Sequence, residues 1–294
     1  MPRYAYVNGQ YLPHRDAMVH VEDRGFQFAD GVYEVVTVQD GRLVDEEGHL
    51  NRLNRSLGEL QMASPMASRT ALELVMRTLI RRNGVVNGII YLQVTRGVAP
   101  RDFRYPSRTK PTLVMTTRHM DLNPVARLEQ GVAVITVPDI RWKRRDIKSV
   151  ALLPQAMGKQ MAAEAGAFEG WMVDDDGTIT EGCSSNAWIV TGDDVLVTRE
   201  PTTRILNGIT RQSVLRLAAD EGIGFEERAF SVAEARAAKE AFLTSATTYV
   251  TPVTRIDGET IGDGQPGRLA RRLRQAYWKY AAGDHVELQA AKGP

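Results

Sequence analysis

The segment DIKSVALLPQ (residues 146–155) is the most informative part of this 294-residue chain, and it follows the basic run RWKRR (141–145). Lys148 lies within it, close in sequence to several other cationic side chains. Nearby positive charge and partial burial both favour the neutral form of a lysine, and a neutral amine can attack a carbonyl carbon. Most basic runs simply face water, so this segment alone predicts no more than a candidate nucleophile.

Three further motifs follow Lys148 along the chain: TEGCSSNAWIV (180–190), RILNGITR (204–211) and FLTSATTYVTPV (242–253). In the second motif, the backbone N–H groups of Gly208, Ile209 and Thr210 come where a loop enters a candidate helix. N–H groups in that position can bind an anion. Thr210 is equally suited to cap the helix, and the two roles are compatible.

The first part of the chain predicts antiparallel strands and two helices. The dipeptides NG (8–9) and DG (40–41) favour hairpin turns between short apolar stretches. Apolar residues then recur every three or four positions over 47–60 and 70–82, which is typical of amphipathic helices. Dense β-branched and apolar residues predict two more strands, at 88–97 and 111–120.

The second part mixes strands and helices without a regular βαβ rhythm. Strands are predicted at 131–140, 170–182 and 186–198, and helices at 153–166, 210–222, 232–240 and 266–282. We therefore predict a mixed α/β (α+β) fold with two domains. The predicted division is a smaller domain at 1–120, a linker at the polar stretch 121–130, and a larger domain at 131–294.

Composition narrows the function classes. The chain has 37 basic and 36 acidic residues and a net charge of +1, so no global field favours nucleic acid or an anionic membrane. Its single cysteine, Cys183, forms neither a disulfide within the chain nor a metal-binding pair. Neither a signal peptide nor a membrane-spanning segment is evident, so we expect a cytoplasmic protein with small-molecule partners.

The four motifs occur in the order and spacing found in class IV aminotransferases, and the chain resembles that family. The likeness is greatest to the D-amino-acid aminotransferases, and it covers nearly the whole chain. Its first half contributes VNGQ (7–10), EDRGFQFADGVYEVV (22–36), HLNRLNRS (49–56) and YLQVTRGVAPR (91–101). The resemblance implies a fold type IV structure, pyridoxal 5′-phosphate (PLP) as the cofactor, no metal, and at least a homodimer with its sites near the subunit interface.

The resemblance also implies a role for each matched residue. Lys148 carries PLP and afterwards moves a proton between the substrate and the cofactor. Glu181 pairs with the pyridine nitrogen, Leu206 lies against the ring, and Arg52 reaches the phosphate, with Arg55 as a second choice. The remaining phosphate contacts are expected from Gly208, Ile209, Thr210, Ser245 and Ala246. Relatives often have threonine where this chain has Ala246, and Thr247 is the neighbour suited to compensate.

Substrate recognition is expected to involve Tyr33 and Arg101, which match two members of the group that binds the substrate carboxylate. The third member is usually a histidine, but this chain has Phe103 there. Arg104 follows and is a possible replacement donor, and a looser, more apolar carboxylate site is the alternative. His49, also matched, is expected to orient the wall of the site.

The predicted function is transfer of an amino group from a D-amino acid to a 2-oxo acid, such as pyruvate or 2-oxoglutarate, by a ping-pong mechanism. A branched-chain L-amino-acid transaminase and an (R)-amine transaminase share the cofactor motifs and remain alternatives. An aminodeoxychorismate lyase and a non-catalytic binding homologue are less favoured, the latter because Lys148 and Glu181 are both present.

Overall fold

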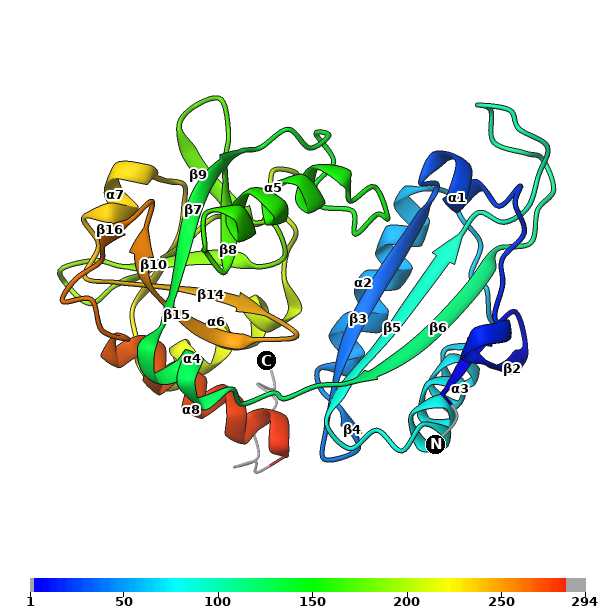
Figure 1. Ribbon diagram of the computed structural model, residues 1–294, viewed down its shortest axis with the longest axis horizontal. Coiled ribbons are helices and arrows are strands. Elements are labelled where there is room, and N and C mark those ends of the chain that lie inside the picture. The colour runs from blue at the N-terminus through cyan, green and yellow to red at the C-terminus, as the bar shows by residue number, and fades with distance from the viewer. Residues whose placement is uncertain (1–2, 284–294) are drawn as a thin grey trace, which may run out of the picture.

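The computed structural model describes residues 3–283 and contains two β-sheets that lie side by side (Figure 1). The first sheet has six antiparallel strands in the order β2-β1-β6-β5-β3-β4. The strands are β1 (Tyr4–Val7), β2 (Gln10–Pro13), β3 (Gly31–Gln39), β4 (Arg42–Leu43), β5 (Gly88–Thr95) and β6 (Thr112–His119). Both predicted hairpin turns are present, with Asn8 and Asp40 at positive φ beside a glycine.

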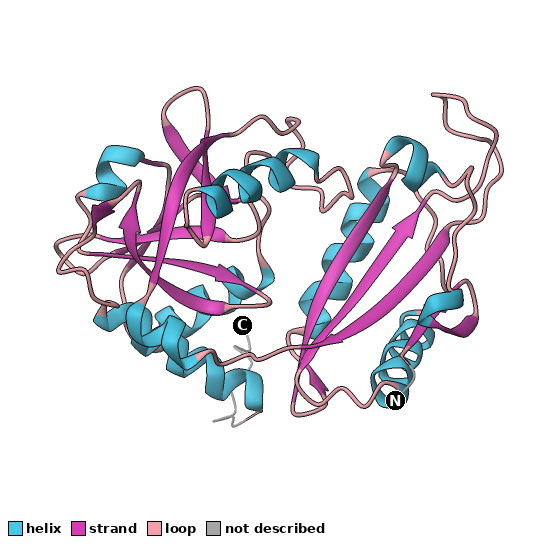
Figure 2. Ribbon diagram, viewed as in Figure 1, coloured by secondary structure: helices cyan, strands magenta, loops and turns pink. Residues whose placement is uncertain are grey.

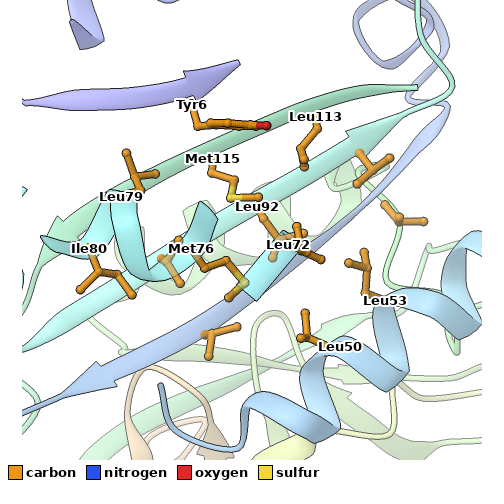
Figure 3. Close-up of a cluster of buried hydrophobic side chains, with 14 of the residues drawn as sticks. Tyr6, Leu50, Leu53, Leu72, Met76, Leu79, Ile80, Leu92, Leu113 and Met115 are labelled. Atoms are coloured by element: carbon orange, nitrogen blue, oxygen red, sulfur yellow. The ribbon is translucent and has the colours of Figure 1, made fainter. Parts of the chain in front are cut away.

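Two helices of the N-terminal half, α2 (Glu46–Glu59) and α3 (Arg69–Arg82), pack on one face of this sheet. A short 3₁₀ turn (His14–Asp16) and the short helix α1 (Arg24–Phe28) precede β3. Figure 3 shows leucines 50 and 53 of α2 and the apolar face of α3 pointing at side chains of β5 and β6. These are the two amphipathic helices that the sequence periodicity predicted.

The second sheet has ten strands in the order β12-β11-β10-β14-β15-β7-β8-β9-β13, with β16 paired to β15. Its strands are β7 (Val132–Pro138), β8 (Glu169–Val173), β9 (Thr178–Gly182), β10 (Asn186–Val190), β11 (Leu196–Thr198), β12 (Phe225–Glu227), β13 (Phe230–Ser231), β14 (Glu240–Ser245), β15 (Tyr249–Ile256) and β16 (Glu259–Thr260). Parallel pairs (β15 with β7, β7 with β8, β11 with β12) occur beside antiparallel ones. The predicted mixed α/β fold is confirmed.

Five helices accompany this sheet: α4 (Val125–Gln130), α5 (Leu153–Glu164), α6 (Ile209–Asp220), α7 (Val232–Arg236) and α8 (Arg268–Ala282). Helices α4 and α8 lie together below it in Figure 2. A core of aromatic and aliphatic side chains joins α6 and α8 to the sheet, including Trp188, Phe242, Tyr249 and Tyr277. Within residues 3–283, no helix has both the length and the hydrophobicity needed to cross a bilayer.

Some details differ from the sequence prediction. The stretch 121–130 contains α4, and the helix predicted at 232–240 ends at Arg236. Glu240 instead begins β14, and its carboxylate accepts hydrogen bonds from the backbone N–H groups of Leu269 and Ala270 at the start of α8. The strands β14 and β15 and the short elements α1, β12, β13 and β16 were not predicted. Residues 284–294 of the predicted second domain lie outside the described residues.

Candidate active site

Strand β3 supplies one wall of the site because its side chains alternate between two faces. Its even-numbered apolar residues pack toward α2 and α3. On the opposite face, Tyr33 and Val35 line a cavity, and Thr37 and Gln39 bond to the C-terminal half. The Thr37 hydroxyl donates to the carbonyl of Ala246 at 2.5 Å, and the Tyr249 hydroxyl donates to Gln39 Oε1 at 2.5 Å.

The cavity lies where the two halves of the chain meet, and it opens to solvent. Side chains and backbone groups of both halves line it. Eleven of the twelve predicted site residues line it: Tyr33, His49, Arg52, Lys148, Glu181, Leu206, Gly208, Ile209, Thr210, Ser245 and Ala246. Arg101 is the exception.

Lys148 faces Tyr33 across this junction. The segment around Lys148 runs antiparallel to the start of β3, with Tyr33 N bonded to Lys148 O at 3.0 Å and Val150 N bonded to Gly31 O at 3.0 Å. The Lys148 amine donates to the Tyr33 hydroxyl at 3.3 Å and stands 4.3 Å from the centre of the tyrosine ring. Backbone pairing thus fixes where the candidate nucleophile enters the cavity.

The basic neighbours of Lys148 are paired with carboxylates. Arg144 bonds to Asp146 and Glu59, and Arg145 bonds to Asp174. The positive field that the sequence predicted beside the amine is therefore largely compensated by negative charge. What makes Lys148 a candidate nucleophile is therefore its position in the cavity. The neighbouring basic residues do not set it apart.

Glu181 marks one end of the cavity. Its carboxylate accepts hydrogen bonds from Asn186 Nδ2 at 3.0 Å and from the backbone N–H of Leu206 at 3.1 Å, and it forms an ion pair with Arg141. Burial raises the pKa of Glu181, while Arg141 and the Leu206 N–H group act in the opposite direction. Asp139 holds the other side of the Arg141 guanidinium at 2.7 Å.

The other end of the cavity is rich in hydrogen-bond donors. Helix α6 begins at Ile209 with Gly208 as its N-cap, and the first N–H groups of a helix lack acceptors within it. The Thr210 hydroxyl is buried and makes no hydrogen bond of accepted geometry to any described residue. Ser245, Ala246 and Thr247 line the same end, so the expected anion site has both amide and hydroxyl donors.

Gly208 is required by close packing. A Cβ atom added there would lie 2.0 Å from Asn186 Oδ1. Asn186 itself donates to Glu181 and to the carbonyl of Leu206 at 2.9 Å, so its amide side chain links Glu181 to the segment that leads into α6.

Arg52 reaches the cavity from α2 and is held by a buried acid. Its Nε and Nη2 atoms donate to Glu34 at 2.7 and 2.8 Å, and its Nη1 donates to the carbonyl of Asn207 at 3.1 Å. His49 Nδ1 lies 2.8 Å from the same carboxylate. Burial alone raises the pKa of Glu34, but Arg52 and His49 outweigh it and lower that pKa to about 2.

Arg55 does not share this position. It bonds to the carboxylate and the carbonyl of Asp146 and does not line the cavity. Arg52 is therefore the arginine of α2 that is placed to contact an anion there.

Arg101 was predicted to contact the substrate carboxylate, but it does not line the cavity of its own chain. It is exposed, with its guanidinium 5.2 Å from the ring centre of Phe28 and 5.5 Å from that of Phe103. Phe103 is 79% exposed, and Arg104 is exposed and paired with Asp102. The loop that carries these residues follows β5, whose last residue, Thr95, pairs with Gly31 at the start of β3. None of its residues Arg101, Phe103 and Arg104 lines the cavity of the same chain.

Sequence reasoning missed the residues that hold the predicted ones in place, among them Glu34, Arg141 and Asn186. Each lies inside a quoted motif, but their roles depend on contacts with residues far away in the sequence. The fit to PLP is nonetheless good on structural grounds. A buried carboxylate stands at one end, a lysine amine at the side, and a buried hydroxyl with helix N–H groups at the other end.

Comparisons with known proteins agree on one family. The model of the class IV amino-transferase family matches residues 31–256. The chain is 41% identical over 276 residues to a D-alanine aminotransferase of Staphylococcus epidermidis, covering 94% of this chain and 96% of that protein. It is 42% identical over 269 residues to a D-alanine aminotransferase of Bacillus licheniformis, covering 92% and 94%. A solved branched-chain amino acid aminotransferase of T.th., with pyridoxamine 5′-phosphate, superposes with a TM-score of 0.90 at 25% identity, covering 98% and 96%.

Proposed function

We propose, from the premise that this chain belongs to the class IV aminotransferase family, that it is a PLP-dependent transaminase acting on D-amino acids. The observation that carries the proposal is the convergence of Lys148, Glu181 and Thr210 in one cavity. Each suits a different part of PLP: the reactive carbon, the ring nitrogen and the phosphate. The proposed amino acceptor is a 2-oxo acid such as pyruvate or 2-oxoglutarate.

The proposed cofactor contacts follow the two ends of the cavity. Glu181 pairs with the ring nitrogen, and Leu206 packs against the ring. The phosphate is bound by Arg52 and by donors of the α6 and β14–β15 segments: Gly208, Ile209, Thr210, Ser245 and Ala246. When bound, PLP supplies a ring that accepts electrons from the carbon atom losing its proton.

Lys148 is the proposed catalytic residue. Its amine carries the cofactor and, once freed, moves the proton between the α-carbon of the substrate and the C4′ atom of the cofactor. The Tyr33 hydroxyl, 3.3 Å from Nζ, orients this amine by accepting a hydrogen bond from it. His49 acts through Glu34, which it shares with Arg52.

The proposed preference for D-amino acids has two supports: the relatives of this chain, and a homodimer whose second subunit contributes to the substrate site. Two bacterial relatives that align with more than nine-tenths of the chain are D-alanine aminotransferases. Arg101 is exposed and does not line the cavity of its own chain, which suits a homodimer in which it reaches the neighbouring subunit's substrate. We also propose the division into domains 1–120 and 131–294 joined by residues 121–130, and a cytoplasmic location.

A branched-chain L-amino-acid transaminase is the alternative that a structural observation favours. Phe103 places an apolar side chain where a polar carboxylate contact is expected, and the fold is shared with branched-chain enzymes. An (R)-amine transaminase would also tolerate that change.

A half-reaction screen separates these alternatives. The PLP-loaded protein is mixed with D-alanine, L-leucine or (R)-phenylethylamine, and the loss of the cofactor's visible absorbance is followed over time. We expect D-alanine to react fastest. Faster reaction with L-leucine would replace the D-amino-acid proposal. Protein that retains no cofactor absorbance after incubation with PLP and removal of the excess would refute the enzyme proposal.

A further inference from the structure

Asp45 occupies an unusual place at the start of α2. It is the N-cap residue of that helix, it has a left-handed backbone with φ of 53°, and its side chain makes no capping bond. The side chain is only 4% exposed. An N-cap aspartate ordinarily accepts bonds from its own helix, so this carboxylate is committed elsewhere.

The carboxylate of Asp45 binds hydroxyl groups of the C-terminal half. It accepts from Ser213 Oγ at 2.9 Å, from the Tyr277 hydroxyl at 2.7 Å and from the Tyr280 hydroxyl at 2.5 Å. The adjacent Val44 is also buried, within the hydrophobic cluster formed around α6 and α8. The start of α2 is therefore docked onto two helices of the other half.

The contacts of Asp45 lie close to the α6 N-terminus, where Gly208 and Thr210 line the cavity. Ser213 is on the first turns of α6, close in sequence to Gly208 and Thr210. Burial raises the pKa of Tyr277 well above its ordinary value, and Asp45 raises it further, while the nearby Thr210 hydroxyl opposes the rise. The Tyr277 hydroxyl therefore stays protonated at neutral pH and donates a hydrogen bond to Asp45, with its oxygen beside Thr210.

Helices α2 and α6 also touch directly. A Cβ atom added at Gly48 would lie 2.9 Å from Ile209 Cγ2, so the two helices approach closely there. One turn further along α2, Arg52 donates to the carbonyl of Asn207 just before α6. The position of Arg52 relative to the α6 N-terminus thus depends on how the start of α2 is anchored.

We propose that Asp45 is a positioning residue that anchors α2 on α6 through Ser213 and on α8 through Tyr277. This anchoring holds Arg52 and the α6 N-terminus in the places where both bind the same phosphate. This inference deepens the proposed function and rests on it. Asp45 has no role in moving protons, since it does not line the cavity.

The test compares two cofactor forms that differ only in the phosphate. Dissociation constants of PLP and of pyridoxal are measured by absorbance for wild type, Asp45→Ala, Asp45→Asn and Tyr277→Phe, all freed of cofactor. We expect Asp45→Ala to weaken PLP binding about tenfold, the size of one or two charge-assisted hydrogen bonds, with little change for pyridoxal. Asp45→Asn should recover part of the loss because its amide oxygen still accepts.

Glu46→Gln is the matched control. Glu46 is the next residue of α2, but its carboxylate pairs with Arg77 of α3 and not with the C-terminal half. Its PLP-to-pyridoxal affinity ratio should equal that of the wild type.

The outcomes are separable. An unchanged affinity ratio in Asp45→Ala, even with a lower melting temperature, would overturn the positioning role and leave a purely structural one. If Asp45→Ala does not fold, the ratio in Tyr277→Phe decides in the same way. Wild-type protein that binds neither form would instead refute the proposed function.

Discussion

The amine of Lys148 and the hydroxyl oxygen of Tyr33 lie 3.3 Å apart, across the junction of the two sheets. Each residue is held by the other's backbone, because Tyr33 N bonds to Lys148 O at 3.0 Å. The candidate nucleophile and its hydrogen-bond acceptor therefore move together, even though 115 positions separate them in the sequence.

Removing the Tyr33 hydroxyl should slow the reaction without emptying the site. Tyr33→Phe loses one hydrogen bond to the amine, worth about 1 kcal/mol, so kcat should fall roughly five- to tenfold. PLP affinity should change little, since Tyr33 is not among the phosphate contacts. Single-turnover kinetics with D-alanine measure the first quantity. Tyr91→Phe is the control, because its hydroxyl donates to Gln93 instead; equal losses in both variants would argue against the role given to Tyr33.

Two arginines of α2 provide a matched comparison. Arg52→Lys cannot keep the forked bonds to Glu34 and the bond to Asn207 O together, so PLP affinity should fall roughly tenfold or more. Arg55→Lys should have little effect on PLP binding, because Arg55 is half-exposed and contacts Asp146. Equilibrium titration with PLP measures both. Similar affinities for the two variants would contradict the assignment of Arg52 to the phosphate.

Gly208 should not tolerate a side chain. In Gly208→Ala the new Cβ would lie 2.0 Å from Asn186 Oδ1, so the start of α6 or the Asn186 amide must shift. We expect a loss of about 1–3 kcal/mol in stability and weaker PLP binding. Gly192→Ala is the control, because no atom lies within 4 Å of its added Cβ. Thermal melting and PLP titration of both variants check the prediction, which fails if the two behave alike.

The buried Glu34 should make stability depend on acid pH. Its pKa is lowered from 4.5 to about 2 in the folded protein, so the folded state binds this proton less readily than the unfolded chain. The resulting stabilisation, of order 3 kcal/mol, is present above pH 4.5 and is lost as the pH falls toward 2. The stability difference between wild type and Glu34→Gln, from urea unfolding, should therefore shrink over that range. A difference independent of pH would show that Glu34 does not carry this charge-dependent stabilisation.

Local patterns in the sequence predicted much of the fold. The three- and four-residue spacing of leucines located α2 and α3 to within a residue, and the NG and DG dipeptides located two hairpins. The helix predicted at 232–240 was too long, because Glu240 bonds to the start of α8. Local helix propensity carries no information about such a distant partner. The strands β12, β13 and β16 are only two or three residues long and carry no clear periodicity.

The family resemblance predicted the residues that converge in the cavity. It did not predict the residues whose roles depend on tertiary contacts. The cofactor residues converge in the cavity, but nothing local marks Glu34 as the acid that holds Arg52 or Arg141 as the partner of Glu181. The basic run around Lys148 was misleading, since its arginines are neutralised by acids as distant in sequence as Glu59 and Asp174. The placement of Arg101 outside its own cavity depends on loop geometry, which the motif match did not contain.

The most direct test of the central claim is to locate the lysine that carries the cofactor. The PLP-loaded protein is reduced with borohydride, which fixes the cofactor on its lysine, then digested and mapped by mass spectrometry. The account predicts that the added mass lies on the peptide containing Lys148 and is absent from Lys148→Ala. Stoichiometric labelling of a different lysine, or equal labelling of Lys148→Ala, would contradict it.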